Sequence, residues 1–143
     1  MSNKNIVNKE RNMFVDDDSV TYNIRNKQGK LLGKFEFHPS DTNIVERFGE
    51  VVDYFNNLTL PDNNDEAIKV AEKELVDKVS YLIGADAKET FFNILGPFSI
   101  LSSGELFVEN VLGAVAKVIE KEMSVRTKKL QRRTNKYVRK YHK

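Results

Sequence analysis

The last part of the chain, from Glu105 to Lys143, contains no proline and one glycine, Gly113. Such a segment can form one helix of roughly 40 residues, about 60 Å long at 1.5 Å per residue. Ser102 and Glu105 have capping-box spacing and are expected to start this helix. A domain of this size cannot cover a helix of that length. We therefore expect the first half to belong to the core and the second half to project or to fold back.

Charge separates along the chain at about the same place. From Met1 to Met123 there are 14 basic residues against 21 acidic ones, a net charge of −7. From Ser124 to Lys143 there are nine basic residues and no acidic ones, so that −7 and +9 give the overall +2. We predict a loose N-terminal arm (residues 1–18), a single globular α+β domain (residues 19–123) and a basic helical C-terminal extension (residues 124–143).

The composition is that of an ordinary globular protein, with 40% apolar and 31% charged residues. Cysteine is absent, which excludes disulfides and thiolate metal sites and is compatible with a reducing cytoplasm. The N-terminal sequence has no apolar core of signal-peptide length, and no stretch approaches the roughly 18 apolar residues of a membrane span. We therefore expect a protein made and used in a cytoplasm, with no membrane partner.

Short β-rich runs near the N-terminus predict a hairpin. The runs "SVTYNI" and "LLGKFEF" flank "RNKQGK", whose Asn and Gly suit a turn, so Ser19 to Phe37 is predicted to be antiparallel. In the second run Leu31, Phe35 and Phe37 alternate with charged residues, which predicts one buried face. A hairpin alone is marginally stable in water, so helices or another chain should cover it.

The clearest helix follows the hairpin directly. Pro39 precedes two candidate N-caps, Ser40 and Asp41. Apolar residues then recur at helical spacing, at Ile44, Val45, Phe48, Val51, Val52 and Phe55. His38 lies at the junction between strand and helix, without a second histidine or a nucleophile near it in the sequence, and no chemical role is expected for it.

Two more helices are predicted before the long C-terminal one. The first begins near Asp65 and ends at Gly84. Its apolar stripe consists of Ile68, Leu75, Val79 and Leu82. The second is short, begins at the capping-box pair Asp86 and Glu89, and ends at Gly96.

The densest apolar stretch surrounds this short helix. It contains Phe91, Phe92, Ile94, Leu95, Phe98, Ile100 and Leu101. We assign it to the core around which the other helices pack, with an aromatic ligand pocket as the alternative. The predicted fold class is α+β, mostly helical: an N-terminal β-hairpin followed by four helices, the last long and basic at its end.

Residue patterns typical of catalysis are missing from the sequence. His38 and His142 are the only histidines, and neither GxSxG nor HExxH occurs. The run "GKLLGKF" has the wrong spacing for a phosphate loop. Asp16, Asp17 and Asp18 are adjacent, whereas a calcium loop takes its ligands from alternate positions, so they predict a solvated turn. We predict a protein that is not an enzyme, with no metal site and no cofactor.

The basic C-terminal segment has a period of seven. Two sets of basic residues follow it: Arg126, Arg133 and Lys140, and Lys129, Lys136 and Lys143. Steps of three and four connect Ile119, Met123, Thr127, Leu130, Thr134, Tyr137 and Tyr141. This is a heptad seam flanked by positive charge, but threonine interrupts it, so docking on an acidic, partly apolar groove fits better than a self-sufficient coiled coil.

This segment is the predicted partner-binding surface. Its candidate contact residues are Arg126, Lys129, Leu130, Arg132, Arg133, Lys136, Tyr137, Arg139, Lys140 and Tyr141. The charge suggests nucleic acid or protein, including the acidic body of a second copy. An anionic membrane would also attract this charge, but the segment lacks the Trp and Phe expected on a membrane-bound apolar face. A solvated helix end, stabilised by basic residues near its C-terminus, is the fourth interpretation.

Two stretches resemble a family of phage proteins. They are "GKFEFHPSDTNIVERFGEVVDYFNNL" and "YLIGADAKETFFNILGPFSILSSGELFVENVLGAVAKVIEKE". The pattern "F.F.P.D" with an amphipathic helix, then "G.DA....F" and a closing helix with a Lys/Arg-rich end, is similar to small tail-region proteins of long-tailed phages and prophages of Gram-positive bacteria. Proteins of this group are taken to be tail assembly chaperones. The resemblance covers about Lys34 to Lys143.

The resemblance implies a non-enzymatic tail morphogenesis factor. Its partners would be the tape-measure protein or tail tube subunits, in the cytoplasm of the bacterial host. The shared positions, which look like fold determinants, are Phe35, Phe37, Pro39, Asp41, Gly84, Asp86 and Phe91. A nucleic-acid-binding protein using the basic helix and a structural subunit of the virion are the alternatives, and a homo-oligomer is a further option.

Overall fold

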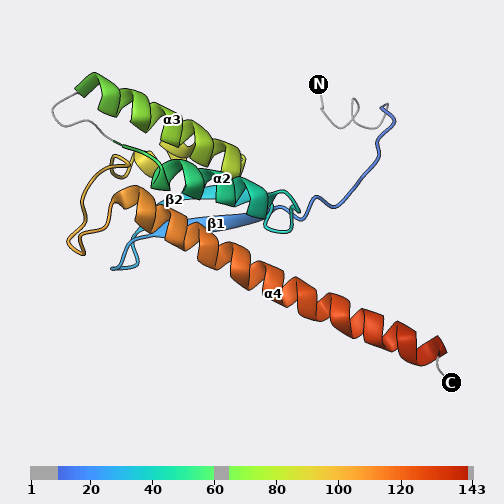
Figure 1. Ribbon diagram of the computed structural model, residues 1–143. Helices are drawn as coiled ribbons and strands as arrows, with labels where there is room; N and C mark the ends of the chain where they lie inside the picture. The colour runs from blue at the N-terminus through green and yellow to red at the C-terminus, as the bar shows by residue number, and fades with distance from the viewer. Residues whose placement is uncertain (1–9, 60–64, 142–143) are drawn as a thin grey trace.

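The computed structural model describes residues 10–59 and 65–141, with side chains up to residue 133 (Figure 1). Its elements are β1 (Val20–Arg25), β2 (Leu31–Phe37), α2 (Ile44–Asn56), α3 (Asp65–Ile83), a π-helical turn η1 (Lys88–Phe92) and α4 (Phe107–Tyr141). The predicted fold class is therefore confirmed: the molecule is α+β and mostly helical, with a hairpin ahead of its helices.

The hairpin has the predicted position and turn. β1 and β2 pair antiparallel, with Val20 opposite Phe37. In the turn, the side-chain oxygen of Asn26 accepts hydrogen bonds from the backbone N–H groups of Gln28 (3.0 Å) and Lys30 (2.9 Å). The side chains that pack on the helices are Tyr22, Ile24, Phe35 and Phe37. Alternation along both strands thus produces one buried face.

The prediction that Leu31 shares this buried face was wrong. Ile24 lies opposite Gly33, but the register shifts after Ile24 and Arg25 lies opposite Leu31. Leu31 keeps 50% of its surface exposed. An irregularity of this kind changes which face the following residues occupy, so simple alternation fails beyond it.

The centre of the core lies between α3 and the first half of α4. Leu75 and Val79 on α3 are fully buried, as is Val108 on α4. α2 contributes Ile44 and Val51. The remaining buried apolar residues of this cluster are Phe37, Leu82, Ile83, Ala87, Phe91, Phe107, Val111, Leu112, Val115 and Ile119. Helical spacing thus predicts most of these buried stripes, but Val45, which was expected on the apolar face of α2, keeps 63% of its surface exposed.

The densest apolar stretch of the sequence is not the centre of this core. Of its seven residues only Phe91 is buried, while Leu95 and Ile100 keep 42% and 76% of their surface exposed. The stretch turns after η1, where the N–H of Ser99 donates to the carbonyl of Gly96 (3.1 Å). Beyond this turn the chain is a surface connection to α4, so its apolar residues are only partly covered.

The last helix begins later than the predicted capping box. Ser102 and Glu105 lie in a turn, where the N–H of Leu101 donates to the carbonyl of Glu105 (2.8 Å). α4 starts beyond this turn, and the carboxylate of Glu109 accepts a hydrogen bond from the N–H of Leu106 (3.0 Å). The capping role predicted for Glu105 therefore belongs to Glu109.

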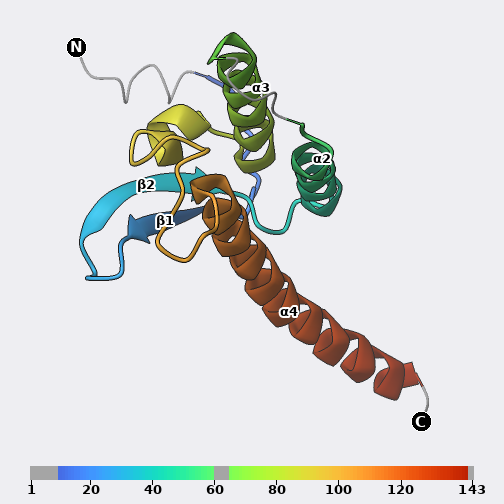
Figure 2. The same cartoon turned by 60° about the vertical axis from the view of Figure 1, so that its left-hand side comes forward.

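α4 is one continuous helix that leaves the body (Figures 1 and 2). Its first half lies along the hairpin and carries the buried residues up to Ile119. Its second half extends past every other element in both views, and the helix continues to Tyr141 without folding back. The structure thus decides between the two courses left open by the sequence.

Candidate interaction surface

A network of polar groups lies where α4 leaves the body. Arg126 contacts Asp18, with its Nη2 at 2.6 Å and its Nε at 3.0 Å from Oδ2. The Nη1 of the same guanidinium donates to the carboxylate of Glu122, one turn earlier on α4. The hydroxyl of Tyr22 on β1 donates to the other oxygen of that carboxylate. The base of the N-terminal arm, the hairpin and α4 are therefore joined at one place.

The network shifts the protonation of its members. Hydrogen bonds from Ser40 and Arg126 hold the pKa of the Asp18 carboxyl below its ordinary value. Hydrogen bonds from Tyr22 and Arg126 likewise lower the pKa of Glu122. Burial, together with the Glu122 carboxylate, raises the pKa of Tyr22 to about 12. At neutral pH both carboxyls are thus ionised and the phenol keeps the proton it donates.

The three adjacent acids do form a turn before β1. The N–H of Asp18 donates to a side-chain oxygen of Asp16 (2.8 Å), and the N–H of Ser19 to one of Asp17 (3.1 Å). Asp18 has a positive φ of 58°, in the left-handed region that aspartate adopts more readily than most residues. The Nδ1 of His38 lies 3.1 Å from the carbonyl oxygen of Asp17. His38 therefore helps to fix the base of the arm.

Beyond Arg126, α4 presents an exposed basic face. Arg126 is one of the predicted contact residues, but its charge is matched within the chain by Asp18 and Glu122. Four further basic residues are exposed: Lys128, Lys129, Arg132 and Arg133. The side chains of Lys136, Tyr137, Arg139, Lys140 and Tyr141 lie outside the described part of the chain, although their backbone belongs to α4.

The apolar seam of the C-terminal segment passes from the core into solvent. Ile119 is buried and Met123 packs against the core, whereas Leu130 keeps 53% of its surface exposed. Val125, which helical geometry places on the side of α4 away from the seam, also keeps 44% of its surface exposed. One helix face thus serves as core in its first half and as an uncovered, partly apolar surface in its second half.

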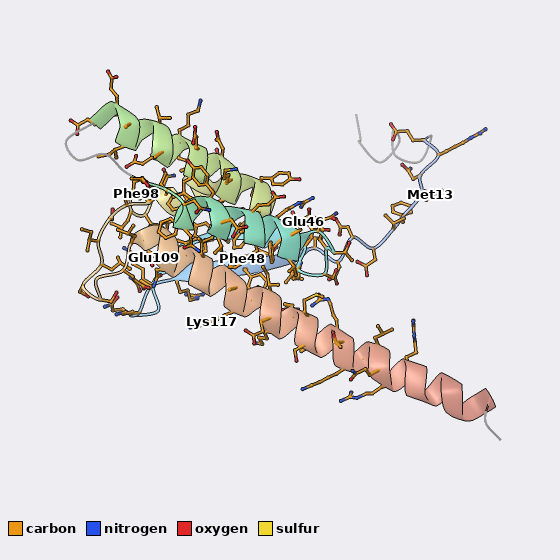
Figure 3. The ribbon with its side chains drawn as sticks, viewed as in Figure 1. Met13, Glu46, Phe48, Phe98, Glu109 and Lys117 are labelled. Atoms are coloured by element: carbon orange, nitrogen blue, oxygen red, sulfur yellow. The ribbon has the colours of Figure 1, made fainter. Side chains whose placement is uncertain are left out.

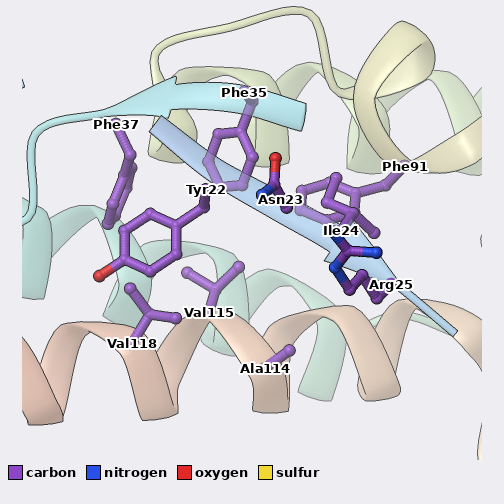
Figure 4. A pocket seen from close by; sticks show the side chains of 10 residues that line it. All are labelled: Tyr22, Asn23, Ile24, Arg25, Phe35, Phe37, Phe91, Ala114, Val115 and Val118. Carbon is purple, nitrogen blue, oxygen red and sulfur yellow. The ribbon is translucent and has the colours of Figure 1, made fainter. Parts of the chain in front are cut away.

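Two adjoining cavities lie between the hairpin and the first half of α4. The smaller, about 200 Å³, is lined by aromatic residues of the hairpin and by Val115 and Val118 of α4 (Figure 4). The larger, about 550 Å³, lies beside the hairpin turn and η1. Ile24, Phe91 and Ala114 line both. Together they form one groove, which we call the hairpin groove.

The sequence pattern alone did not locate this groove. The predicted alternative of an aromatic ligand pocket included Phe91, which does line both cavities. The remaining walls come from both strands of the hairpin and from α4. The distance between a hairpin and a helix far along the chain depends on packing, which periodicity does not encode. The aromatic alternation of β2 was the available signal.

Comparison of the chain with models of known protein families, with curated proteins and with solved structures finds no match. None of the helices in the described part of the chain has both the length and the apolar character of a membrane span.

Proposed function

We propose that the chain is a non-enzymatic binding protein that holds other proteins with the projecting end of α4, and that it acts as a phage tail assembly chaperone. The observation that carries this proposal is the course of α4, which leaves the body and presents exposed basic residues beside an uncovered apolar seam. The partners would be the tape-measure protein or tail tube subunits, in the cytoplasm of the bacterial host.

Two features favour a protein partner for this surface. Leu130 and Val125 are exposed among the basic residues, and an exposed apolar side chain gains most from contact with another apolar surface. A partner helix with apolar residues on one face and acidic residues beside them matches both features. The lysines and arginines would then steer the encounter and fix the orientation of the partner.

Co-expression with the tape-measure protein, followed by affinity capture, tests the proposal. The structure suggests a chain that ends at Thr127, because this variant keeps Arg126 and its contacts with Asp18 and Glu122. We expect the full chain to retain the tape-measure protein and the shortened chain to lose it. Equal retention by both chains would show that the end of α4 does not bind the tape-measure protein. If neither chain retains it, the tape-measure protein is not the partner.

The exposed lysines and arginines also give a second candidate, binding of nucleic acid along the same face. In that case the logarithm of the affinity falls with the logarithm of salt concentration, with a slope set by the number of phosphates neutralised. Arg132→Glu with Arg133→Glu should then weaken DNA binding. Absence of DNA binding at low salt would exclude this candidate.

The third candidate, a structural subunit of the virion, can be distinguished from a chaperone by where the protein is found. A virion subunit is found in purified particles, whereas a chaperone is released before assembly ends. Detection of the chain in purified particles at a fixed ratio to the tail tube subunit would favour the virion subunit.

A further inference from the structure

The N-terminal arm carries three consecutive apolar side chains that are largely exposed to solvent. Met13, Phe14 and Val15 keep 89%, 88% and 80% of their surface exposed. They belong to a segment without secondary structure, and Met13 lies away from the rest of the molecule (Figure 3). Contiguous exposed apolar residues mark interaction sites, because their burial removes apolar surface from water.

The base of the arm is held so that this apolar segment points outward. Asp18 contacts Arg126, and the carbonyl of Asp17 lies beside His38. These contacts are at the start of β1, next to the point where α4 leaves the body. From there the arm extends away from the hairpin (Figures 1 and 3). The apolar segment is thus displayed to a neighbouring molecule.

The hairpin groove is a matching acceptor. Its two cavities, about 200 and 550 Å³, are open and lined largely by apolar side chains, among them Phe35, Phe91 and Val115. Figure 4 shows the aromatic rings of the hairpin directed toward α4, with Phe91 of η1 entering from the side. Space of this size accommodates a phenylalanine side chain with its apolar neighbours.

In the part of the chain that the structure describes, β1 has an unpaired backbone edge beside the groove. The described sheet has two strands, β1 and β2, so one edge of β1 has no strand partner. Residues of β1 from Tyr22 to Arg25 line the smaller cavity. An extended segment that enters the groove can therefore form backbone hydrogen bonds with this edge, as in β-strand addition.

Charge favours the same pairing. The described arm ahead of Asp18 holds Glu10, Asp16 and Asp17 against Arg11, a net charge of −2. The groove wall near the hairpin turn holds two basic residues, Arg25 and Lys27, against the single acidic residue Glu105. An acidic segment with an apolar centre thus faces a basic rim around an apolar floor.

From these features we infer that the arm of one copy binds the hairpin groove of a second copy, with Met13 to Val15 in the cavities. Two copies that exchange arms form a closed, symmetric dimer, whereas transfer in one direction builds a longer assembly. Exchange of a terminal segment costs little, because the body of each copy keeps its own core. This inference does not depend on the function of the α4 end.

Cross-linking tests it directly, since the chain has no cysteine. One protein carries Val15→Cys and a size tag, and another carries Ala114→Cys, at an exposed position that lines both cavities. After mixing and treatment with a short thiol-reactive cross-linker, we expect a mixed dimer. The control is Glu120→Cys, also exposed on α4 but on another side of the helix. An equal yield of mixed dimer with the control would overturn the inference. A third protein carries both Val15→Cys and Ala114→Cys; if cross-linking occurs only within this single chain and never between two chains, the inference is also overturned.

Light scattering after size-exclusion chromatography, over a range of concentrations, gives an independent measure. The wild-type chain should have a mass above its monomer mass of 16.5 kDa. Phe14→Asp should raise the concentration needed for association about tenfold or more, while Phe14→Leu should leave it nearly unchanged. A wild-type monomer at all concentrations, or association unaffected by Phe14→Asp, would contradict arm exchange. Since Phe14 is 88% exposed, neither substitution should alter folding.

Discussion

Two nitrogens of the Arg126 guanidinium donate hydrogen bonds to the carboxylate of Asp18, although the two residues are 108 positions apart in the sequence. This contact ties the base of the N-terminal arm to α4 at the point where the helix leaves the body. It turns one residue of the basic segment into a structural anchor. The exposed positive face therefore begins beyond Arg126, at Lys128.

Loss of this anchor should destabilise the fold. Arg126→Ala removes the hydrogen bonds to Asp18 and Glu122, and we expect the free energy of unfolding to fall by roughly 1 kcal/mol, because the network is only partly shielded from water. Urea unfolding measures the change. Lys129→Ala, at an exposed position on the same helix, is the matched control and should lie within about 0.5 kcal/mol of the wild type. Equal effects of both would show that the network contributes nothing.

The decrease in stability at acid pH should depend on the same network. The carboxyls of Asp18 and Glu122 have lowered pKa values in the folded protein, so their contribution is present above their unfolded pKa values of about 4. It is lost as the pH falls through the lower, folded pKa values. Asp18→Asn with Glu122→Gln should therefore reduce the urea midpoint at pH 7 more than at acid pH. A midpoint difference that is constant with pH would refute this.

Tyr22 and Tyr54 should ionise late. Burial raises the pKa of Tyr22 and of Tyr54 to about 12, with the carboxylates of Glu122 and Glu74 as further causes. Because the folded state favours the protonated phenol, this contribution to stability is complete below about pH 10 and is lost as the pH rises through 12. The ultraviolet absorbance of tyrosinate follows the titration. Tyr22→Phe should remove the tyrosinate absorbance that Tyr22 contributes near pH 12, and Tyr54→Phe should remove that of Tyr54. If neither variant changes the titration near this pH, the raised pKa values of these two tyrosines would be contradicted.

The core assignment makes a larger prediction. Leu75 on α3 is completely buried, so Leu75→Ala should lower the free energy of unfolding by about 2 to 5 kcal/mol, through lost burial and the cavity left behind. Val70 on the same helix keeps 57% of its surface exposed, and Val70→Ala should change it by about 0.5 kcal/mol or less. Chemical denaturation of both variants checks the contrast. Similar costs would mean that α3 does not bury the stripe described here.

Local patterns predicted the elements of this fold well. Turn residues at Asn26 and Gly29 and aromatic alternation predicted the hairpin, and helical spacing predicted α2 and α3. The end of α3 follows from Gly84, whose φ of 70° suits a glycine after a helix. These signals act over a few residues, so a single sequence contains them.

Long-range features could not be predicted in the same way. The pairing of Arg126 with Asp18 and the groove between β1 and α4 arise from the packing of distant segments. The register shift after Ile24 likewise changed the face of Leu31 without a local signal.

The central claim is that the basic face on the projecting end of α4 holds a protein partner. The dissociation constant for the tape-measure protein, measured with two variants of equal charge change, tests it most directly. One is Arg132→Glu with Arg133→Glu; the other is Lys69→Glu with Lys73→Glu, at exposed positions of α3. We predict about tenfold or more weakening for the α4 variant and little change for the α3 variant. Equal weakening of both, or unchanged binding of the α4 variant, would contradict the account.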